Sequence, residues 1–366
     1  MSSPESQDTG APVPQDVRAP TVLSPREGGP EVAMPWLPTL FQNPYADRIL
    51  TEFRWHAYLR ANPDVAANAT DEAAALRHFY YRGYYERRVP DRDRLYGFDG
   101  GFYRERYPEL GLVDDAEAQI HYCYLGYYEG RLPNRATAWY FDSDLHVFQM
   151  GKVGSHSIAQ ALEASGSDRK AVQLHWLSDF HLNAPGLRIP YRDILLRPRE
   201  RPLQVLSGTR EIVSWALAGI FQYFGGQLQS LEQAAQMTEE RFLEICESGL
   251  TWFDHQYFCG LDVYAHPFPV DAGAVRITHG PLDLLVYRQE DMRRISGVVG
   301  EFLGIPGFSI GKANAGEGKP YASVYREFLA SVRFPGNVLA RLYDRPFMRH
   351  FYSDAEREEA YARWVA

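Results

Sequence analysis

One short segment carries most of the side chains that could perform chemistry. Residues 145–162 read LHVFQM-GKVGSHS-IAQAL, an apolar run followed by a glycine-containing turn and a helical pattern. A turn at the start of a helix directs free backbone N–H groups and the positive end of the helix dipole at one place. The segment therefore predicts a phosphate-binding loop. Its candidate binding residues are Gly151, Lys152, Val153, Gly154, Ser155, His156 and Ser157.

This loop differs from the two common phosphate motifs. A Walker A loop has a Lys after its second glycine, whereas Lys152 precedes Gly154, and no GxGxxG is present. A plain turn between a strand and a helix is the alternative interpretation of the same residues.

A second candidate anion site follows the next apolar run. Leu203–Ser207 predicts a strand, which leads to Arg210 and then to a helical pattern. A guanidinium group can bind two phosphate oxygens at once, and Ser214, one turn later, offers another donor. The alternative is that Arg210 pairs with a neighbouring carboxylate.

A candidate base lies between the two loops. An alternating run ends at His175, and a histidine can accept a proton from a hydroxyl near neutral pH. His181 is a weaker candidate. A hydrogen-bonded structural histidine is the alternative.

The order K-x-G-S-x-S after a strand resembles the 5′-phosphosulfate loop of sulfotransferases that use 3′-phosphoadenosine 5′-phosphosulfate. Lys152, Gly154, Ser155 and Ser157 match that loop, and Arg210 matches the arginine that binds the 3′-phosphate in that family. A closer resemblance is to bacterial capsular polysaccharide synthesis proteins. It is carried by MGKVGS, by residues 252–268, 284–292 and 350–356, and covers roughly 145–365.

The resemblance implies an α/β fold with a three-layer, mostly parallel sheet of P-loop-like sulfotransferase architecture. It implies transfer of a sulfuryl group from 3′-phosphoadenosine 5′-phosphosulfate to a carbohydrate hydroxyl, in bacterial polysaccharide or glycan biosynthesis. Lys152 and His175 would be catalytic, the loop, Arg210 and Ser214 would hold the nucleotide, and no metal would be needed.

The chain departs from the family pattern at several positions. Glu211-Ile212 replaces Asp-Pro, Ala218 replaces a serine, Gln173 replaces the first histidine of an H-x-H pair, and His156 replaces a Thr or Ser. Two alternatives therefore stay open. One is a catalytically degenerate scaffold that binds nucleotide or glycan, and the other is a P-loop-like kinase.

The elements that must position these residues alternate between strand and helix patterns. Apolar runs at 145–150, 203–207 and 284–287 predict strands. Helical patterns occupy 157–164, 211–224, 231–247, 289–303, 321–331 and 354–364, the last opened by a capping box at Ser353 and Glu356. This alternation predicts an α/β layer with a largely parallel sheet.

The preceding region contains a duplication. Residues 43–136 hold two tyrosine-rich copies, in which 71–81 and 114–124 look helical and the following glycines suit helix C-caps. The matching pairs are Tyr58/Tyr103, Pro63/Pro108, His78/His121, Gly83/Gly126 and Pro90/Pro133. We expect the tyrosines to form a small core and the two histidines to be packed or surface groups, and not ligands. The alternative is a surface that binds a sugar, an assembly partner or a second copy of the chain.

Length and composition limit the remaining choices. We expect three segments: a disordered Pro-rich tail (1–42), the repeat (43–136) and the α/β domain (137–366). A net charge of -9 disfavours a nucleic-acid partner, and three cysteines without CxxC disfavour a disulfide scaffold or cysteine zinc site. With neither an apolar run of about 18 residues nor a signal-peptide pattern, we expect a cytoplasmic protein without an integral membrane segment.

Four weaker patterns are also present in the sequence. Asp142-Ser143-Asp144 is a DxD, but it precedes its strand, whereas a metal-binding DxD should follow one. Arginines between 188 and 201 could hold an anionic glycan or form a solvated loop. Lys312, Asn314 and Lys319 could cover a nucleotide or form a polar turn, and 252–255 could line an acceptor cleft or belong to an aromatic core.

Overall fold

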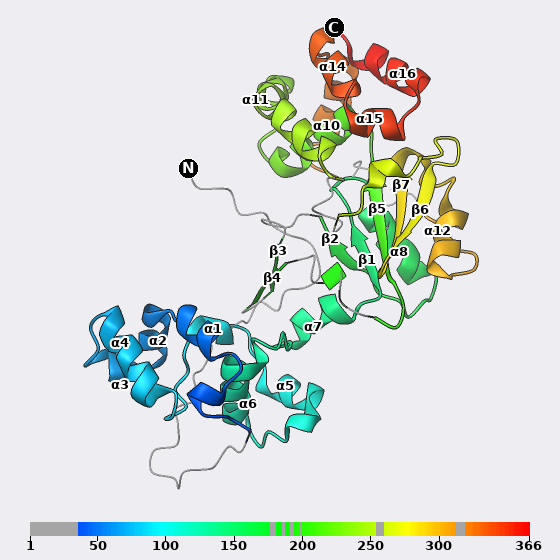
Figure 1. Cartoon of the computed structure of the whole chain (residues 1–366). Coiled ribbons are helices and arrows are strands. Elements are labelled where there is room, and N and C mark those ends of the chain that lie inside the picture. Colours follow the sequence, from blue (N-terminus) through cyan, green and yellow to red (C-terminus); the bar gives the residue numbers. More distant parts are fainter. Residues whose placement is uncertain are drawn as a thin grey trace. The chain divides into compact units, whose positions relative to one another are not determined.

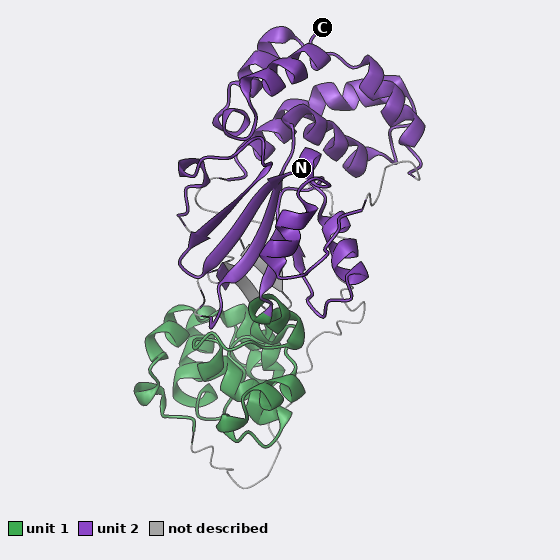
Figure 2. Ribbon diagram, turned by 90° about the vertical axis from the view of Figure 1, so that its right-hand side faces the viewer, with its two compact units in different colours: residues 1–142, 182–189 green, residues 143–181, 190–366 purple. Residues whose placement is uncertain are grey.

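The computed structural model describes residues 36–175, 181–184, 187–190, 194–195, 197, 199–253, 260–311 and 319–366. The chain forms two compact units, residues 1–142 with 182–189 and residues 143–181 with 190–366 (Figure 2). The expected boundary at 136/137 falls inside a helix, α7 (Arg135–Asp142), that belongs to the first unit. Residues 1–35 of the expected tail lie outside the described residues.

The first unit repeats one order of helices twice (Figure 1). Short helices, Leu40–Gln42 and α1 (Ala46–Thr51), precede the copies. The first copy comprises α2 (Trp55–Ala61), α3 (Pro63–Ala66), α4 (Glu72–His78), a π-helical turn Phe79–Gly83 and a 3-10 turn Arg92–Leu95. The second comprises α5 (Gly100–Arg106), a 3-10 turn Pro108–Leu110, α6 (Asp115–His121), a π-helical turn Tyr122–Gly126 and α7.

Each copy is held together by a buried tyrosine that contacts a histidine and a glycine. Tyr58 Oη lies 2.9 Å from His78 Nδ1, and Tyr103 Oη lies 2.9 Å from His121 Nδ1. A side chain at Gly83 would overlap the Tyr58 hydroxyl, and Gly126 has the same relation to Tyr103. His121 is buried and His78 is half-buried.

The expectation that Gly83 and Gly126 are helix C-caps is wrong. Both lie inside π-helical turns and neither has a positive φ. The left-handed positions come four residues later, at Arg87 (φ 57°) and Gly130 (φ 71°). The glycines are needed because a tyrosine approaches the helix there, and not because the helix ends.

The second unit is built on a sheet of α/β type. In the described part of the chain, five strands lie in the order β2-β1-β5-β7-β6. They are β1 (Leu145–Phe148), β2 (Val172–Leu174), β5 (Leu203–Thr209), β6 (Ala274–His279) and β7 (Leu282–Arg288). β2, β1, β5 and β7 pair in parallel, and β6 pairs antiparallel with β7 at one edge. Strands β3 (His181–Ala184) and β4 (Leu187–Pro190) form a separate two-stranded sheet, and residues 182–189 of it belong to the first unit.

Two helices cover one face of the main sheet. Leu145 and Val147 of β1, Leu206 of β5 and Leu285 of β7 face α8 (Ser155–Ala164) and α12 (Ser296–Leu303) in one apolar cluster. Every residue of β1 and β7 is buried, as expected for parallel strands covered on both faces. The sheet thereby fixes the points at which β1 and β5 end.

The remaining helices lie beyond one end of the sheet (Figure 1). They are α10 (Ile212–Phe224), α11 (Leu231–Leu250), α13 (Ala322–Ser331), α14 (Gly336–Tyr343), α15 (Pro346–Phe351) and α16 (Asp354–Trp364). The predicted capping box of α16 is present. No helix among the described residues is long and apolar enough to cross a membrane.

Two predictions about this unit need correction. The helix expected at 289–303 begins only at Ser296, after a 3-10 turn Gln289–Asp291 that Arg288 fixes through its ion pair with Asp291. The edge strand β6 and helices α14 and α15 were not predicted. β6 carries polar exposed residues, and α15 spans only six residues, so neither has a distinctive apolar pattern.

Candidate functional site

The order in which the chain adds strands to the sheet reverses between β1 and β5. From β1 the chain crosses to β2 on one side, and it later places β5 on the other side and continues to β7. Ligands of open α/β sheets bind outside the carboxyl ends of the strands at such a switch point. The predicted loop after β1 and Arg210 after β5 both leave the sheet here, so the topology brings the two candidate anion sites together.

The loop after β1 leaves the start of α8 without a protein cap. The N-cap residue is Gly154, with φ 96°, and it has no side chain that could accept from the first helical N–H groups. Lys152 also has a positive φ, 67°, a conformation that costs a residue with a Cβ free energy. The amides of Ser155, His156 and Ser157 therefore begin the helix facing a place that suits an anion.

Hydrogen bonds from three other elements fix this loop. Trp215 of α10 donates from Nε1 to the carbonyl of Gly151 at 2.5 Å, and Arg210 donates from Nη1 to the carbonyl of Lys152 at 3.3 Å. Gln149 Oε1 accepts from Tyr287 Oη at 2.7 Å and from the Gly208 amide at 3.1 Å. The loop is thus preorganised by the sheet and by α10 before any ligand binds.

Three cations converge on the loop. Lys152 is half-buried, and burial together with the positive charges of Lys319 and Arg210 lowers the pKa of its ammonium group to about 8. Lys319 lies three residues before the start of α13 (Ala322–Ser331), so the basic segment expected near the nucleotide does contribute a charge here. Lys312 and Asn314 of that segment lie outside the described residues. Such a cluster of like charges favours an anionic ligand.

The start of α10 differs from the start of α8. Glu211 is its N-cap, and its carboxylate accepts from the amides of Val213 at 2.8 Å and Ser214 at 2.9 Å. The same carboxylate accepts from Tyr343 Oη of α14 at 2.8 Å and from Trp364 Nε1 of α16 at 3.3 Å. The first amides of α10 are therefore already bonded to the Glu211 carboxylate. After β5, this leaves the Arg210 side chain as the group that can donate hydrogen bonds to an anion.

His175 contacts the loop instead of standing apart from it. Its Nε2 lies 3.2 Å from Ser155 Oγ, and its Nδ1 lies 3.4 Å from the carbonyl oxygen of Gln149. Since a carbonyl only accepts, a neutral His175 in this contact carries its proton on Nδ1, and its Nε2 then accepts from Ser155. His156 is exposed and lies 3.0 Å from Gln160 of the same helix, so its side chain serves the helix surface.

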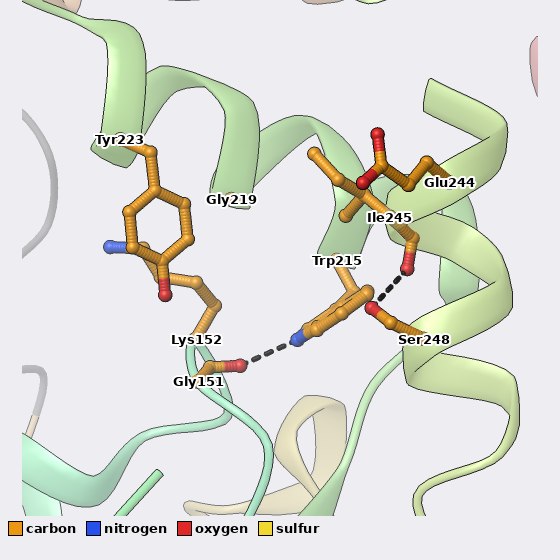
Figure 3. A pocket seen from close by; sticks show the side chains of 8 residues that line it. All are labelled: Gly151, Lys152, Trp215, Gly219, Tyr223, Glu244, Ile245 and Ser248. Carbon is orange, nitrogen blue, oxygen red and sulfur yellow. Dashed lines mark hydrogen bonds between the residues drawn. The ribbon is translucent and has the colours of Figure 1, made fainter. Parts of the chain in front are cut away.

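A pocket of about 300 Å³ opens beside Lys152, between α10 and α11 (Figure 3). It is lined by the loop, by one face of α10 and by α11: Gly151, Lys152, Trp215, Gly219, Tyr223, Glu244, Ile245 and Ser248. The α10 residues recur every four positions, which places them on one face of the helix. Sequence analysis missed this lining, although that spacing in IVSWALAGIFQYF was a readable signal.

The other predicted residues have different surroundings. Ser214 lies outside the pocket lining, its backbone amide is bonded to Glu211, and its hydroxyl remains a predicted donor to the nucleotide. The carboxylates of the DxD pair with arginines, Asp142 with Arg106 and Asp144 with Arg169. Residues 254 and 255, Arg192 and the side chains of His181 and Arg188 lie outside the description. Trp252 belongs to the core, where it contacts Phe148 and donates to Ser207.

Among the described residues, no group of three or more His, Cys, Asp or Glu side chains is arranged to hold a metal ion. Comparisons of this chain with protein-family models, with curated proteins and with solved structures gave no match.

Proposed function

We propose that this protein transfers a sulfuryl group from 3′-phosphoadenosine 5′-phosphosulfate to a carbohydrate hydroxyl. The observation that carries the proposal is the convergence of Lys152, Arg210 and Lys319 on an α8 terminus whose N-cap is a glycine. Two anionic groups on one ligand would meet two separate donors, the amides that begin α8 and the guanidinium of Arg210. The resemblance of the loop to the 5′-phosphosulfate loop supports the same ligand.

Each group has a definite role in this reaction. The acceptor oxygen forms a bond to sulfur while the bond from sulfur to the 5′-phosphate oxygen breaks, and the bisphosphate nucleotide leaves. Lys152 and the first amides of α8 stabilise the charge that develops on the leaving oxygen. Removal of one such preorganised donor typically costs on the order of a hundredfold or more in rate.

His175 is the proposed base for the acceptor hydroxyl proton. In the free protein its Nε2 lone pair accepts from Ser155 Oγ. The acceptor hydroxyl must therefore displace Ser155 from His175, or pass its proton through the Ser155 hydroxyl.

A second function is favoured by the same contact. His175 is already bonded to Ser155, so the group expected to act as the base has a protein partner. A scaffold that binds the nucleotide without transfer fits this bond. It predicts binding of the donor and no product with any acceptor.

Calorimetric titration with 3′-phosphoadenosine 5′-phosphate tests the shared premise of both functions. We expect micromolar binding to the unchanged protein, and binding at least tenfold weaker to Lys152→Met and Arg210→Gln. Lys170→Met is the matched control, because Lys170 is exposed and precedes β2 at the opposite end of the strands. Preference for ATP with magnesium would favour the kinase alternative, and no binding of either nucleotide would refute both functions.

A further inference from the structure

The pocket between α10 and α11 adjoins the anion loop on one side only. Its lining includes Gly151 and Lys152, but neither Arg210 nor any residue of α8. The groups proposed to hold the donor thus lie outside the pocket, and Lys152 is common to both. A group-transfer site needs this arrangement, with the donor and the acceptor reaching one catalytic cation from different directions.

The chemistry of the lining differs from that of the anion loop. Trp215 is buried, and its Nε1 is occupied by the Gly151 carbonyl, so it offers the pocket a ring surface. Tyr223 is 53% exposed and presents a second ring at the opening. In Figure 3, Tyr223 and Lys152 stand on one side of the pocket, and α11 contributes Glu244 and Ser248 on the other.

The charges of the described lining residues cancel. Among these residues Lys152 is the one cation and Glu244 the one carboxylate, and Glu244 also accepts from Arg241 at 3.1 Å. The Ser248 hydroxyl donates to the carbonyl of Ile245 at 2.8 Å, which leaves its oxygen lone pairs to accept. An acidic ligand would face the Glu244 carboxylate, whereas a neutral polyol would find acceptors for its hydroxyl protons.

We propose that this pocket binds the acceptor of the proposed sulfuryl transfer as one uncharged sugar ring. The C–H face of the ring would pack on Trp215 and Tyr223, and its hydroxyls would donate to Glu244 and Ser248. The volume is at the lower end of the range for small-ligand sites, which suits a single ring. The inference rests on the proposed function for the identity of the donor, but the pocket can be tested without it.

Gly219 allows a clean test. A Cβ at this position would meet only Ile245 Cγ2, at 3.9 Å, so alanine fits and favours the helix, whereas leucine extends into the pocket. We would measure binding of maltotriose by saturation-transfer NMR, with trigalacturonate and p-nitrophenol as acidic and phenolic probes. The same proteins would be titrated with 3′-phosphoadenosine 5′-phosphate.

We expect maltotriose to bind the unchanged protein and Gly219→Ala, and to bind Gly219→Leu at least tenfold more weakly, with the bisphosphate affinity unchanged. If Gly219→Leu proves unstable, Tyr223→Ala, which alters an exposed side chain, replaces it. This variant should also bind maltotriose at least tenfold more weakly. The inference is wrong if no neutral sugar binds, or if trigalacturonate or p-nitrophenol binds better.

The bisphosphate titration separates the two proposals. Loss of bisphosphate binding in a folded Gly219→Leu protein would assign the pocket to the nucleoside, which overturns this inference and leaves the proposed transfer intact. No bisphosphate binding to the unchanged protein, with maltotriose still lost in Gly219→Leu, would overturn the proposed transfer and leave the sugar pocket standing.

Discussion

Replacement of Lys152 by Met tests whether the loop keeps an unfavourable charge in place for a ligand. Methionine keeps the length of the side chain and has the same difficulty with a φ of 67°, so the substitution removes only the ammonium group. Burial and the charges of Lys319 and Arg210 lower the pKa of Lys152 from 10.5 to about 8. At pH 7 the charged form therefore costs the folded protein up to about 3 kcal/mol. We expect Lys152→Met to raise the free energy of unfolding by about 1 to 3 kcal/mol.

The pH dependence of this gain has a definite sign. Between pH 8 and pH 10.5 the unfolded chain keeps the proton of Lys152 and the folded protein releases it. The stability of the unchanged protein consequently rises with pH through this window, and the variant lacks this contribution. At pH 9.5 the free energy of unfolding of Lys152→Met should exceed that of the unchanged protein by only about 1 kcal/mol.

Urea unfolding of both proteins at pH 7 and pH 9.5, followed by tryptophan fluorescence, measures the effect. The transition that differs between them belongs to the second unit, where Lys152 lies. The same preparations should bind 3′-phosphoadenosine 5′-phosphate about 10- to 100-fold more weakly after the substitution, since one hydrogen bond to a charged group is lost. A variant that is less stable at pH 7, or a difference that does not change with pH, would refute the reasoning.

Three further predictions concern single residues. Lys319→Gln should weaken bisphosphate binding several-fold and lower its dependence on salt, as measured by calorimetry at two ionic strengths, because it removes one cation from the cluster. Gly154→Ala should lower the free energy of unfolding by about 1 to 2 kcal/mol in urea, because φ is 96° and the new methyl group displaces the Met292 side chain. Burial lowers the pKa of His121 from 6.5 to about 4, so the unfolded chain binds more protons between these values and stability falls as the pH drops through this window. Between pH 6.5 and pH 4 the free energy of unfolding should fall in both proteins. In His121→Gln it should fall by up to about 3 kcal/mol less than in the unchanged protein, as urea titrations would show.

The sequence was sufficient for features that depend on local patterns. The strand, loop and helix around Lys152 and the capping box at Ser353 were predicted because apolar period and capping chemistry are local. A largely parallel sheet followed from the alternation of strands and helices, and β2, β1, β5 and β7 do pair in parallel. The duplication was visible because identical residues recur at fixed offsets.

Long-range contacts were outside the reach of such patterns. Glu211 was considered only as a departure from Asp-Pro, whereas its carboxylate caps α10 and accepts from Tyr343 and Trp364. Partners more than 100 residues apart leave no local signal. His175 was predicted at the end of a strand and directly follows β2, but its bond to Ser155 depends on the pairing of β1 with β2, which sequence periodicity does not specify.

The Glu211 carboxylate also makes the C-terminal helices part of the same cooperative unit as the loop. It joins the residue beside Arg210 to α14 and α16, so local opening of those helices releases the cap of α10. By linkage, a ligand that holds Arg210 in place must also lower the population of molecules in which α16 is detached. Proteolytic protection of the last helix is therefore a remote and label-free reporter of occupancy at the anion site.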